Sequence, residues 1–273
     1  MVAETHPGKV RDHNEDAIFC SADDALALIA DGMGGHAAGE VASEIAVHTF
    51  EEIKPEADKL VATAVESHQR IVSHAEANVE SRGMGSALVV AKFEKQEVSV
   101  CWVGDSRAYL YNRDQGLQAL TRDHSYVQWL LANGQITEHQ AKIHPDRNLV
   151  TQCLGINPPQ PEMNTVSWQG DDIVLLCSDG LTDELDDSEI ESILKQEQAL
   201  DDALQQLLTA ALDHGGKDNI SIVLAQNNFK ALQIKPPKME VGELRSTSWV
   251  PIAVGVGSAV LIALLWVAIQ SIF

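Results

Sequence analysis

The chain repeatedly places an aspartate at the end of an apolar, strand-like run. This happens in LALIADGMGG, VSVCWVGDSR and IVLLCSDGLTD, while in KDNISIVLA the aspartate comes just before the run. The aspartates concerned are Asp31, Asp105, Asp179, Asp183 and Asp218. A carboxylate that is removed from water must be paired or must bind a cation, so this placement is costly for structure alone. Carboxylates from such distant parts of the sequence predict one site that holds more than one divalent ion.

The spacing of the strand-like runs predicts antiparallel sheets. These runs cover residues 25–30, 88–93, 98–103, 107–111, 173–178 and 220–225. Because several of them are neighbours joined by short connections, they favour meanders over a doubly wound parallel sheet. With helices outside the sheets, the predicted class is α+β.

Helical periodicity is clearest between the first two strand-like runs. Apolar residues recur at helical spacing after Gly39 at Ala42, Ile45, Ala46, Thr49, Phe50 and Ile53. A second helix is predicted over about 57–80, with one stripe formed by Val61, Ala64, Val65, His68, Val72, Ala75 and Val79.

The second half of the chain predicts shorter helices. Residues 126–142 are expected to form a helical pair, in which Thr137 and Gln140 make a capping box. Residues 143–165 are expected to be a loop or flap, followed by helices at about 187–197 and 199–213. One domain is predicted over residues 1–228.

Charge restricts the partners of this domain. The formal net charge is −21, and such an acidic surface argues against nucleic acid, which demands Lys and Arg patches. It does not exclude phosphorylated proteins, because metal ions can supply positive charge locally.

The C-terminal part of the sequence predicts a membrane anchor. Residues 229–248 contain Pro236-Pro237 and are interpreted as a linker, and residues 249–270 as a transmembrane helix. Residues 250–269 are uncharged and apolar, and about 20 such residues span a hydrocarbon core. Lysines and an arginine precede the segment, so the positive-inside rule places the domain in the cytoplasm of a single-pass protein. The N-terminus has no apolar region typical of a signal peptide.

Two further motifs add candidate ligands. In GKVRDHNED, Arg11 can hold a phosphate in a bidentate manner, and Glu15 and Asp16 can reach a metal ion or its waters. In DGMGG, the glycines allow a sharp turn, and Gly32 can lend its carbonyl oxygen to a metal. Taken alone, the first motif is equally compatible with a solvated charge run and the second with an ordinary turn.

Six ordered motifs together resemble a known family. They are THPGKVRDHNEDA, LIADGMGGHAAGEVAS, VGDSRAYL, LTRDHS, CSDGLTDEL and KDNISIVL, within residues 5–226. In this respect the chain resembles the metal-dependent serine/threonine protein phosphatases (PPM, or type 2C) in their bacterial form. The resemblance implies a β-sandwich of two antiparallel sheets flanked by helices, in four layers (αββα).

The resemblance also implies roles for individual residues. Two tightly bound Mg²⁺ or Mn²⁺ ions are expected, with Asp31 bridging them and the Gly32 carbonyl on one. Asp179 and Asp218 are expected on the other ion, and Glu15 to act directly or through water. A third, weaker ion is expected between Asp105 and Asp179, with Asp183 nearby. Arg11 matches the residue that binds the substrate phosphate. The catalytic set is thus Arg11, Asp31, Asp179 and Asp218.

The implied reaction is hydrolysis of phosphoserine and phosphothreonine by a hydroxide that bridges the two ions, without a phosphoenzyme. Eukaryotic members carry a histidine where this chain has Met33, so the group that protonates the leaving oxygen is not identified. The expected partners are phosphorylated proteins and a cognate Ser/Thr kinase. Two alternatives stay open, namely a catalytically weak phosphoprotein-binding scaffold and a two-metal phosphatase of small phosphomonoesters.

Overall fold

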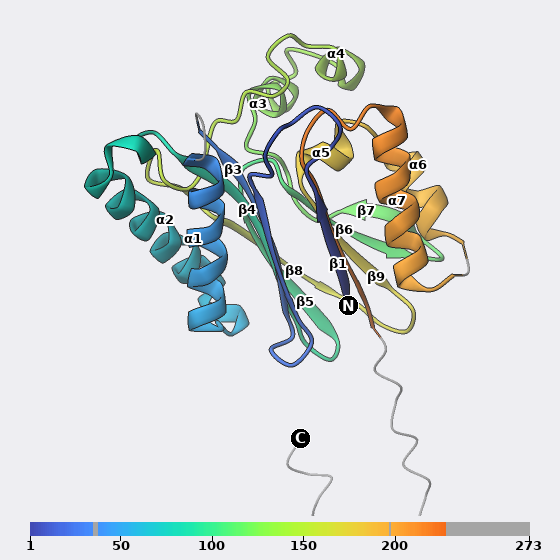
Figure 1. Cartoon of the computed structure of the whole chain (residues 1–273). Helices are drawn as coiled ribbons and strands as arrows, with labels where there is room; N and C mark the ends of the chain where they lie inside the picture. Colours follow the sequence, from blue (N-terminus) through green and yellow to red (C-terminus); the bar gives the residue numbers. More distant parts are fainter. Residues whose placement is uncertain (35–37, 197, 228–273) are drawn as a thin grey trace, which may run out of the picture. The chain divides into compact units, whose positions relative to one another are not determined.

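The computed structural model describes residues 1–34, 38–196 and 198–227 (Figure 1). The linker predicted at 229–248 and the transmembrane helix predicted at 249–270 lie outside the described residues, so both stay predictions, as does the domain boundary at 228. Within residues 1–34, 38–196 and 198–227, no helix combines the length and the apolar composition that crossing a membrane requires.

The described residues build two five-stranded sheets in which every pair of neighbouring strands is antiparallel. The first sheet has the order β1 (Val2–His6), β10 (Ile220–Gln226), β9 (Ile173–Cys177), β6 (Arg107–Asn112) and β7 (Gly116–Ala119). The second has the order β2 (Asp16–Ser21), β3 (Leu26–Met33), β4 (Gly85–Phe93), β5 (Glu97–Val103) and β8 (Glu162–Ser167).

Helices cover the outer face of each sheet, which gives the four expected layers (Figure 1). Helices α1 (Ala38–Ile53) and α2 (Leu60–Ala77) lie against the second sheet, and α6 (Asp187–Leu194) and α7 (Leu200–His214) against the first. Short 3₁₀ turns at Ala57–Lys59 and Val79–Ser81 flank α2. The remaining helices, α3 (Tyr126–Ala132), α4 (Glu138–Lys142) and α5 (Asp179–Thr182), gather near one end of the strands (Figure 1).

Alternation along the strands divides the apolar side chains among three interfaces. In β3, Leu26, Leu28 and Ala30 face α1 and α2, whereas Ala27 and Ile29 face the other sheet. Because both faces of each sheet are covered, the central strands are largely apolar on both faces, unlike a sheet with one face in water.

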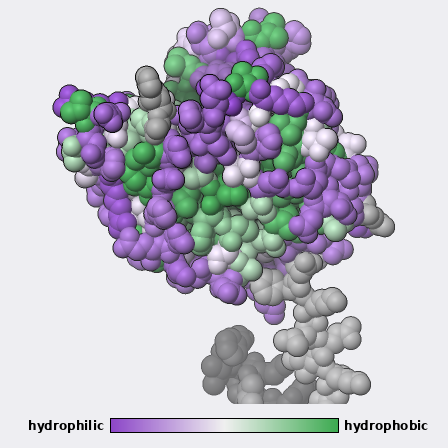
Figure 2. Space-filling model, in the orientation of Figure 1, coloured by the Kyte–Doolittle hydropathy of each residue, from purple (hydrophilic) through white to green (hydrophobic). Residues whose placement is uncertain are grey.

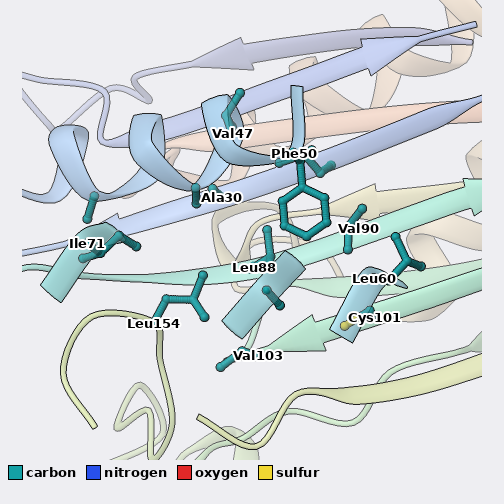
Figure 3. Packing of buried hydrophobic residues seen from close by; sticks show 14 of the residues in the cluster. Ala30, Val47, Phe50, Leu60, Ile71, Leu88, Val90, Cys101, Val103 and Leu154 are labelled. Carbon is teal, nitrogen blue, oxygen red and sulfur yellow. The ribbon is translucent and has the colours of Figure 1, made fainter. Parts of the chain in front are cut away.

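The interface between the second sheet and its helices is close-packed (Figure 3). The Phe50 ring projects from α1 toward Leu88 and Val90 of β4, and Leu60 and Ile71 of α2 belong to the same buried cluster. The edge strands β1 and β2 of the two sheets contact each other. On the side of the molecule shown in Figure 2, hydrophobic residues gather in the middle of the surface.

The expected strands at 25–30, 88–93, 98–103, 107–111, 173–178 and 220–225 correspond to β3, β4, β5, β6, β9 and β10. Four strands were not predicted. The loop expected at 143–165 is wrong at its end, because β8 begins at Glu162. β8 is an edge strand whose residues are exposed or half-buried, and only two of them, Met163 and Val166, are apolar, so it lacks the apolar run that marks a buried strand.

The buried face of α2 also differs from the prediction. It is formed by Leu60, Thr63, Ala64, Ser67 and Ile71, and of the predicted stripe only Ala64 is fully buried. Thr63 and Ser67 can be buried because each hydroxyl donates to a carbonyl oxygen four residues earlier, over 3.0 Å in both cases. The capping box of Thr137 and Gln140 at the start of α4 is confirmed.

Candidate metal centre

The aspartates singled out by the sequence come together where the central strands end. Asp31 lies near the end of β3, Asp179 opens α5 directly after β9, and Asp218 precedes β10. The pKa of Asp31 is raised well above its usual range by burial and then by the charges of its neighbours Asp16, Asp179, Asp105 and Asp218. Such interactions require short distances, so residues far apart in the sequence share one site.

Asp179 provides a second view of the same cluster. Burial raises the pKa of Asp179, and the charges of Asp105, Asp183 and Asp218 raise it further. Several carboxylates that repel one another in a mostly half-buried site are stabilised as anions by a cation. The donors are all oxygens, which suits Mg²⁺ or Mn²⁺ better than a thiolate-seeking metal.

The carboxylates are not drawn in around a common centre. In the part of the chain that the structure describes, no three His, Cys, Asp or Glu side chains stand at the spacing of a closed metal cage. One reason is that Asp218 already has partners. Arg11 Nη2 donates to its Oδ2 over 2.6 Å, and the Asn219 backbone N–H donates to its Oδ1 over 2.8 Å. The electrostatic interactions therefore identify the carboxylates that share this site.

Arg11 lies at the solvent side of this cluster. Its side chain is 53% exposed, and the hydrogen bond to Asp218, followed by the charge of that carboxylate, raises the pKa of Arg11. An exposed guanidinium beside a group of metal-type carboxylates can exchange Asp218 for a phosphate with little rearrangement.

Glu15 and Gly32 are held in place by backbone contacts. The Gly32 N–H donates to the Glu15 carbonyl oxygen over 3.1 Å, and the Glu15 N–H donates to Asn219 Oδ1 over 2.8 Å. A Cβ atom at Gly32 would stand 2.1 Å from the Gly39 carbonyl oxygen, so only glycine fits there. Burial raises the pKa of Glu15, and Arg11 opposes this shift.

Asp16, which the sequence suggested as a residue able to reach a metal ion or its waters, is bound by protein groups in the structure. It lies opposite Asp31 in the β2–β3 register. Its Oδ2 accepts from the hydroxyls of Ser178 (2.8 Å) and Ser221 (2.6 Å), which belong to the other sheet. Burial raises the pKa of Asp16 to about 6, and the two hydroxyl bonds oppose the shift. These bonds pin the two sheets together beside the acidic cluster. Nothing in the sequence signals that two serines converge on this carboxylate.

The segment that carries α3 and α4, residues 126–149, is called the flap here. Asn148 Nδ2 donates to Asp183 Oδ2 over 3.2 Å, and Lys142 pairs with Asp186 at the start of α6. A cavity of about 820 Å³, the flap cavity, lies beneath it and is lined also by Asp105, Asp179 and Asp183. The flap therefore borders the acidic cluster directly.

The loop before Asp105 is fixed from the base of the flap. The Gly104 N–H donates to His124 Nδ1 over 3.1 Å, and Arg107 grips Asp123 through two hydrogen bonds of 2.8 and 2.7 Å. Asp105 is half-buried, and burial raises its pKa to about 6, with the charge of Asp123 as the next cause. The contacts of His124 and Asn148 were not predicted, because they depend on how the flap returns over the strand ends.

Comparisons with known proteins identify this arrangement. The family described as protein phosphatase 2C matches residues 8–225. The serine/threonine phosphatase stp of Listeria innocua is 38% identical over 240 residues, which cover 82% of this chain and 94% of that one. These matches span almost the whole described part of the chain.

Two solved structures have the same fold. The catalytic domain of the serine/threonine protein phosphatase PstP in complex with two manganese ions is 32% identical, with a TM-score of 0.75 and coverage of 82% of this chain and 96% of that one. PppA, described as a key regulatory component of T6SS in Pseudomonas aeruginosa, is 33% identical, with a TM-score of 0.73 and the same coverage. The chain therefore belongs to the protein phosphatase 2C family, and its enzyme class is that of the protein serine/threonine phosphatases. The predicted α+β sandwich and enzyme class are confirmed.

Proposed function

We propose that the chain hydrolyses phosphoserine and phosphothreonine in proteins, using two Mg²⁺ or Mn²⁺ ions held at the acidic cluster. The observation that carries the proposal is the convergence of Asp31, Asp179 and their acidic neighbours beside Arg11. The two manganese ions in the PstP structure support the choice of metal.

The residues of the chain divide the work of holding ions and substrate. Asp31, Asp179 and Asp218 would hold the two main ions together with Glu15 and the Gly32 carbonyl, and Asp105 and Asp183 would serve a third. When bound, such ions supply positive charge for the phosphoryl group and lower the pKa of water.

Arg11 and the groups behind the ligands perform the remaining tasks. Arg11 would move from Asp218 to the substrate phosphate and stabilise its oxygens through two parallel hydrogen bonds. Asp16, fixed by Ser178 and Ser221, keeps the end of β2 against β3 so that Asp31 stays in place.

A direct assay tests this function. The full chain in detergent micelles is mixed with a phosphothreonine peptide, and phosphate release is measured with MnCl₂ and with EDTA. We expect at least about 1,000-fold faster release with manganese, since metal-ion stabilisation is worth several kcal/mol. Turnover of small phosphomonoesters alone would favour the alternative two-metal phosphatase. Absence of all metal-dependent turnover would leave the scaffold alternative.

We also propose that residues 249–270 anchor the enzyme in a membrane, with its catalytic domain in the cytoplasm near a Ser/Thr kinase that phosphorylates its substrates. The support is the uncharged apolar stretch and the preceding Lys235, Lys238 and Arg245. Residues 246–273 fused to a soluble reporter should enter the membrane fraction and resist carbonate extraction. A reporter that stays soluble contradicts the anchor.

A further inference from the structure

Four cationic side chains line the flap cavity, and two of them have no partner within residues 1–34, 38–196 and 198–227. Arg107 is bound by Asp123, and Lys142 by Asp186. The guanidinium groups of Arg122 and Arg147 make no hydrogen bond or ion pair with any residue that the structure describes. In a chain with a net charge of −21, carboxylates are available to pair with most arginines. Two unpaired arginines in a partly enclosed cavity are therefore candidates for binding an anion.

Arg122 is held close to one side of the acidic cluster. Its carbonyl oxygen accepts a hydrogen bond of 2.9 Å from Trp102 Nε1. The next residue, Asp123, is gripped by Arg107 and lies near enough to Asp105 to raise the pKa of that carboxyl. The backbone of Arg122 is therefore fixed at both ends, while its side chain is exposed in the cavity.

Arg147 reaches the same cavity from the flap. Its backbone N–H donates to the His144 carbonyl oxygen over 3.2 Å, in a turn that follows α4. The next residue, Asn148, donates to Asp183, which is a neighbour of Asp179. Arg122 therefore directly precedes Asp123, a neighbour of Asp105, and Arg147 directly precedes Asn148, which contacts Asp183.

We propose that Arg122 and Arg147 form an anion subsite that binds a second acidic group of the substrate, close to its phosphorylated residue. This proposal rests on the proposed function. A peptide whose phosphate is bound by the ions that Asp31 and Asp179 would hold could place its neighbouring residues in the flap cavity, because Asp179 and Asp105 also line that cavity. The chemistry recognised is an anion with paired oxygens, either a carboxylate side chain or a further phosphate, which guanidinium groups bind in a bidentate manner.

The rest of the cavity is compatible with a peptide. Val127, Leu131 and Leu185 supply apolar lining, and Gln128 supplies a polar group. Several carboxylates also line the cavity, and their charges oppose anion binding. Asp123 and Asp186 are paired with Arg107 and Lys142, whereas Glu138 and Asp187 have no such cationic partner among the described residues, so the preference depends on both arginines acting together.

Selectivity between matched peptides tests the subsite. The full chain in detergent, with saturating manganese, is given three phosphothreonine peptides of equal length. One has glutamines beside the phosphothreonine, one has glutamates at the same positions, and one has a second phosphothreonine. We expect kcat/KM to be about tenfold higher for at least one of the two acidic peptides than for the glutamine peptide. The ratio should fall with added salt, because exposed charges are screened.

Variants assign the preference to the two arginines. The double variant Arg122→Gln, Arg147→Gln should bring the ratio of kcat/KM values to about one, and Arg147→Lys should give an intermediate ratio, because it keeps the charge without the bidentate geometry. Arg82→Gln is the matched control, since Arg82 is an exposed arginine that lines a different cavity, and it should keep the wild-type ratio.

The outcomes separate this subsite from the proposed function. If wild-type protein turns over all three peptides at the same kcat/KM, the subsite is wrong while the phosphatase function stands. The subsite is also wrong if the double variant keeps the wild-type ratio. Turnover of no peptide with manganese overturns the proposed function and the subsite with it.

Discussion

Strands β3 and β9 each connect two contrasting regions. One is the apolar core between the sheets, and the other is the acidic edge, the group of carboxylates around Asp31 and Asp179. Ile29 and Leu176 are fully buried between the sheets, and their cluster is almost entirely apolar. At the ends of the same strands the chain leads into Asp31 and Asp179, whose neighbours are other carboxylates. In the metal-free protein the core therefore stabilises the fold, and the edge works against it.

A finer comparison lies within the edge itself. Asp16 and Asp31 are opposite each other on β2 and β3. Asp16 receives two hydroxyl bonds from Ser178 and Ser221, whereas Asp31 is surrounded by charges of its own sign. One carboxylate accepts hydrogen bonds from protein hydroxyls, and the other is the one proposed to hold a cation.

The largest effect is expected from a substitution that removes a carboxylate from the acidic edge. Asp31→Asn should lower metal-dependent release of phosphate by about 1,000-fold, because a shared metal ligand is lost. The same variant should be at least as stable as the wild type in EDTA, since one of several repelling charges is gone. Phosphate release and thermal unfolding in EDTA measure the two effects. Near-wild-type activity would contradict the assignment of Asp31.

A substitution in the apolar core should instead lower the stability of the metal-free protein. Phe50→Ala empties a fully buried position between α1 and β4 and should cost about 3–5 kcal/mol of unfolding free energy. Urea unfolding of the metal-free protein measures it. Ile53→Ala is the matched control on the same helix, where the side chain is 41% exposed, and it should cost below about 1 kcal/mol. Equal costs for both variants would show that this packing is not as described.

Metal binding should offset the repulsion between the carboxylates of the acidic edge and so stabilise the folded protein. Manganese at 100 times its dissociation constant should stabilise the wild type by about 2.7 kcal/mol, because only the folded protein assembles the site. The rise in Tm on adding MnCl₂ measures this effect, and Asp31→Asn should reduce it strongly. A wild-type Tm that ignores manganese would mean that the carboxylates do not hold it.

The smallest expected effect concerns pH. Burial raises the pKa of both Asp16 and Asp105 to about 6, above the value of about 3.9 for an unfolded aspartate. The folded protein therefore binds more protons between these values, and the stability from these groups is lost as pH rises through about 6. In EDTA, Tm should fall between pH 5 and pH 7, with a shallower slope in Asp105→Asn. A slope unchanged in that variant would argue against a raised pKa of Asp105.

The parts predicted from the sequence were those with a local signal. Continuous apolar runs located the six central strands, and aspartates at their ends located the site. Edge strands such as β8 were missed because their exposed and half-buried positions are mostly polar and leave no such run. The buried face of α2 was missed because Thr63 and Ser67 satisfy their hydroxyls within the helix. The roles of Ser178, Asn148 and Arg122 depend on contacts between segments distant in the sequence, which one sequence does not display.

The pairing of β1 with β10 has a consequence for how the enzyme is made. Val2 stands opposite Leu224, so the first and last strands of the fold are neighbours in one sheet. Asp218 and Ser221, which complete the acidic cluster and the link to Asp16, belong to the segment that leaves the ribosome last in this domain. The contacts of Arg11 and Asp31 with Asp218 can form only after nearly the whole domain has been synthesised. Contacts of such long sequence separation form slowly. The proposed metal site is therefore incomplete until β10 has joined the sheet.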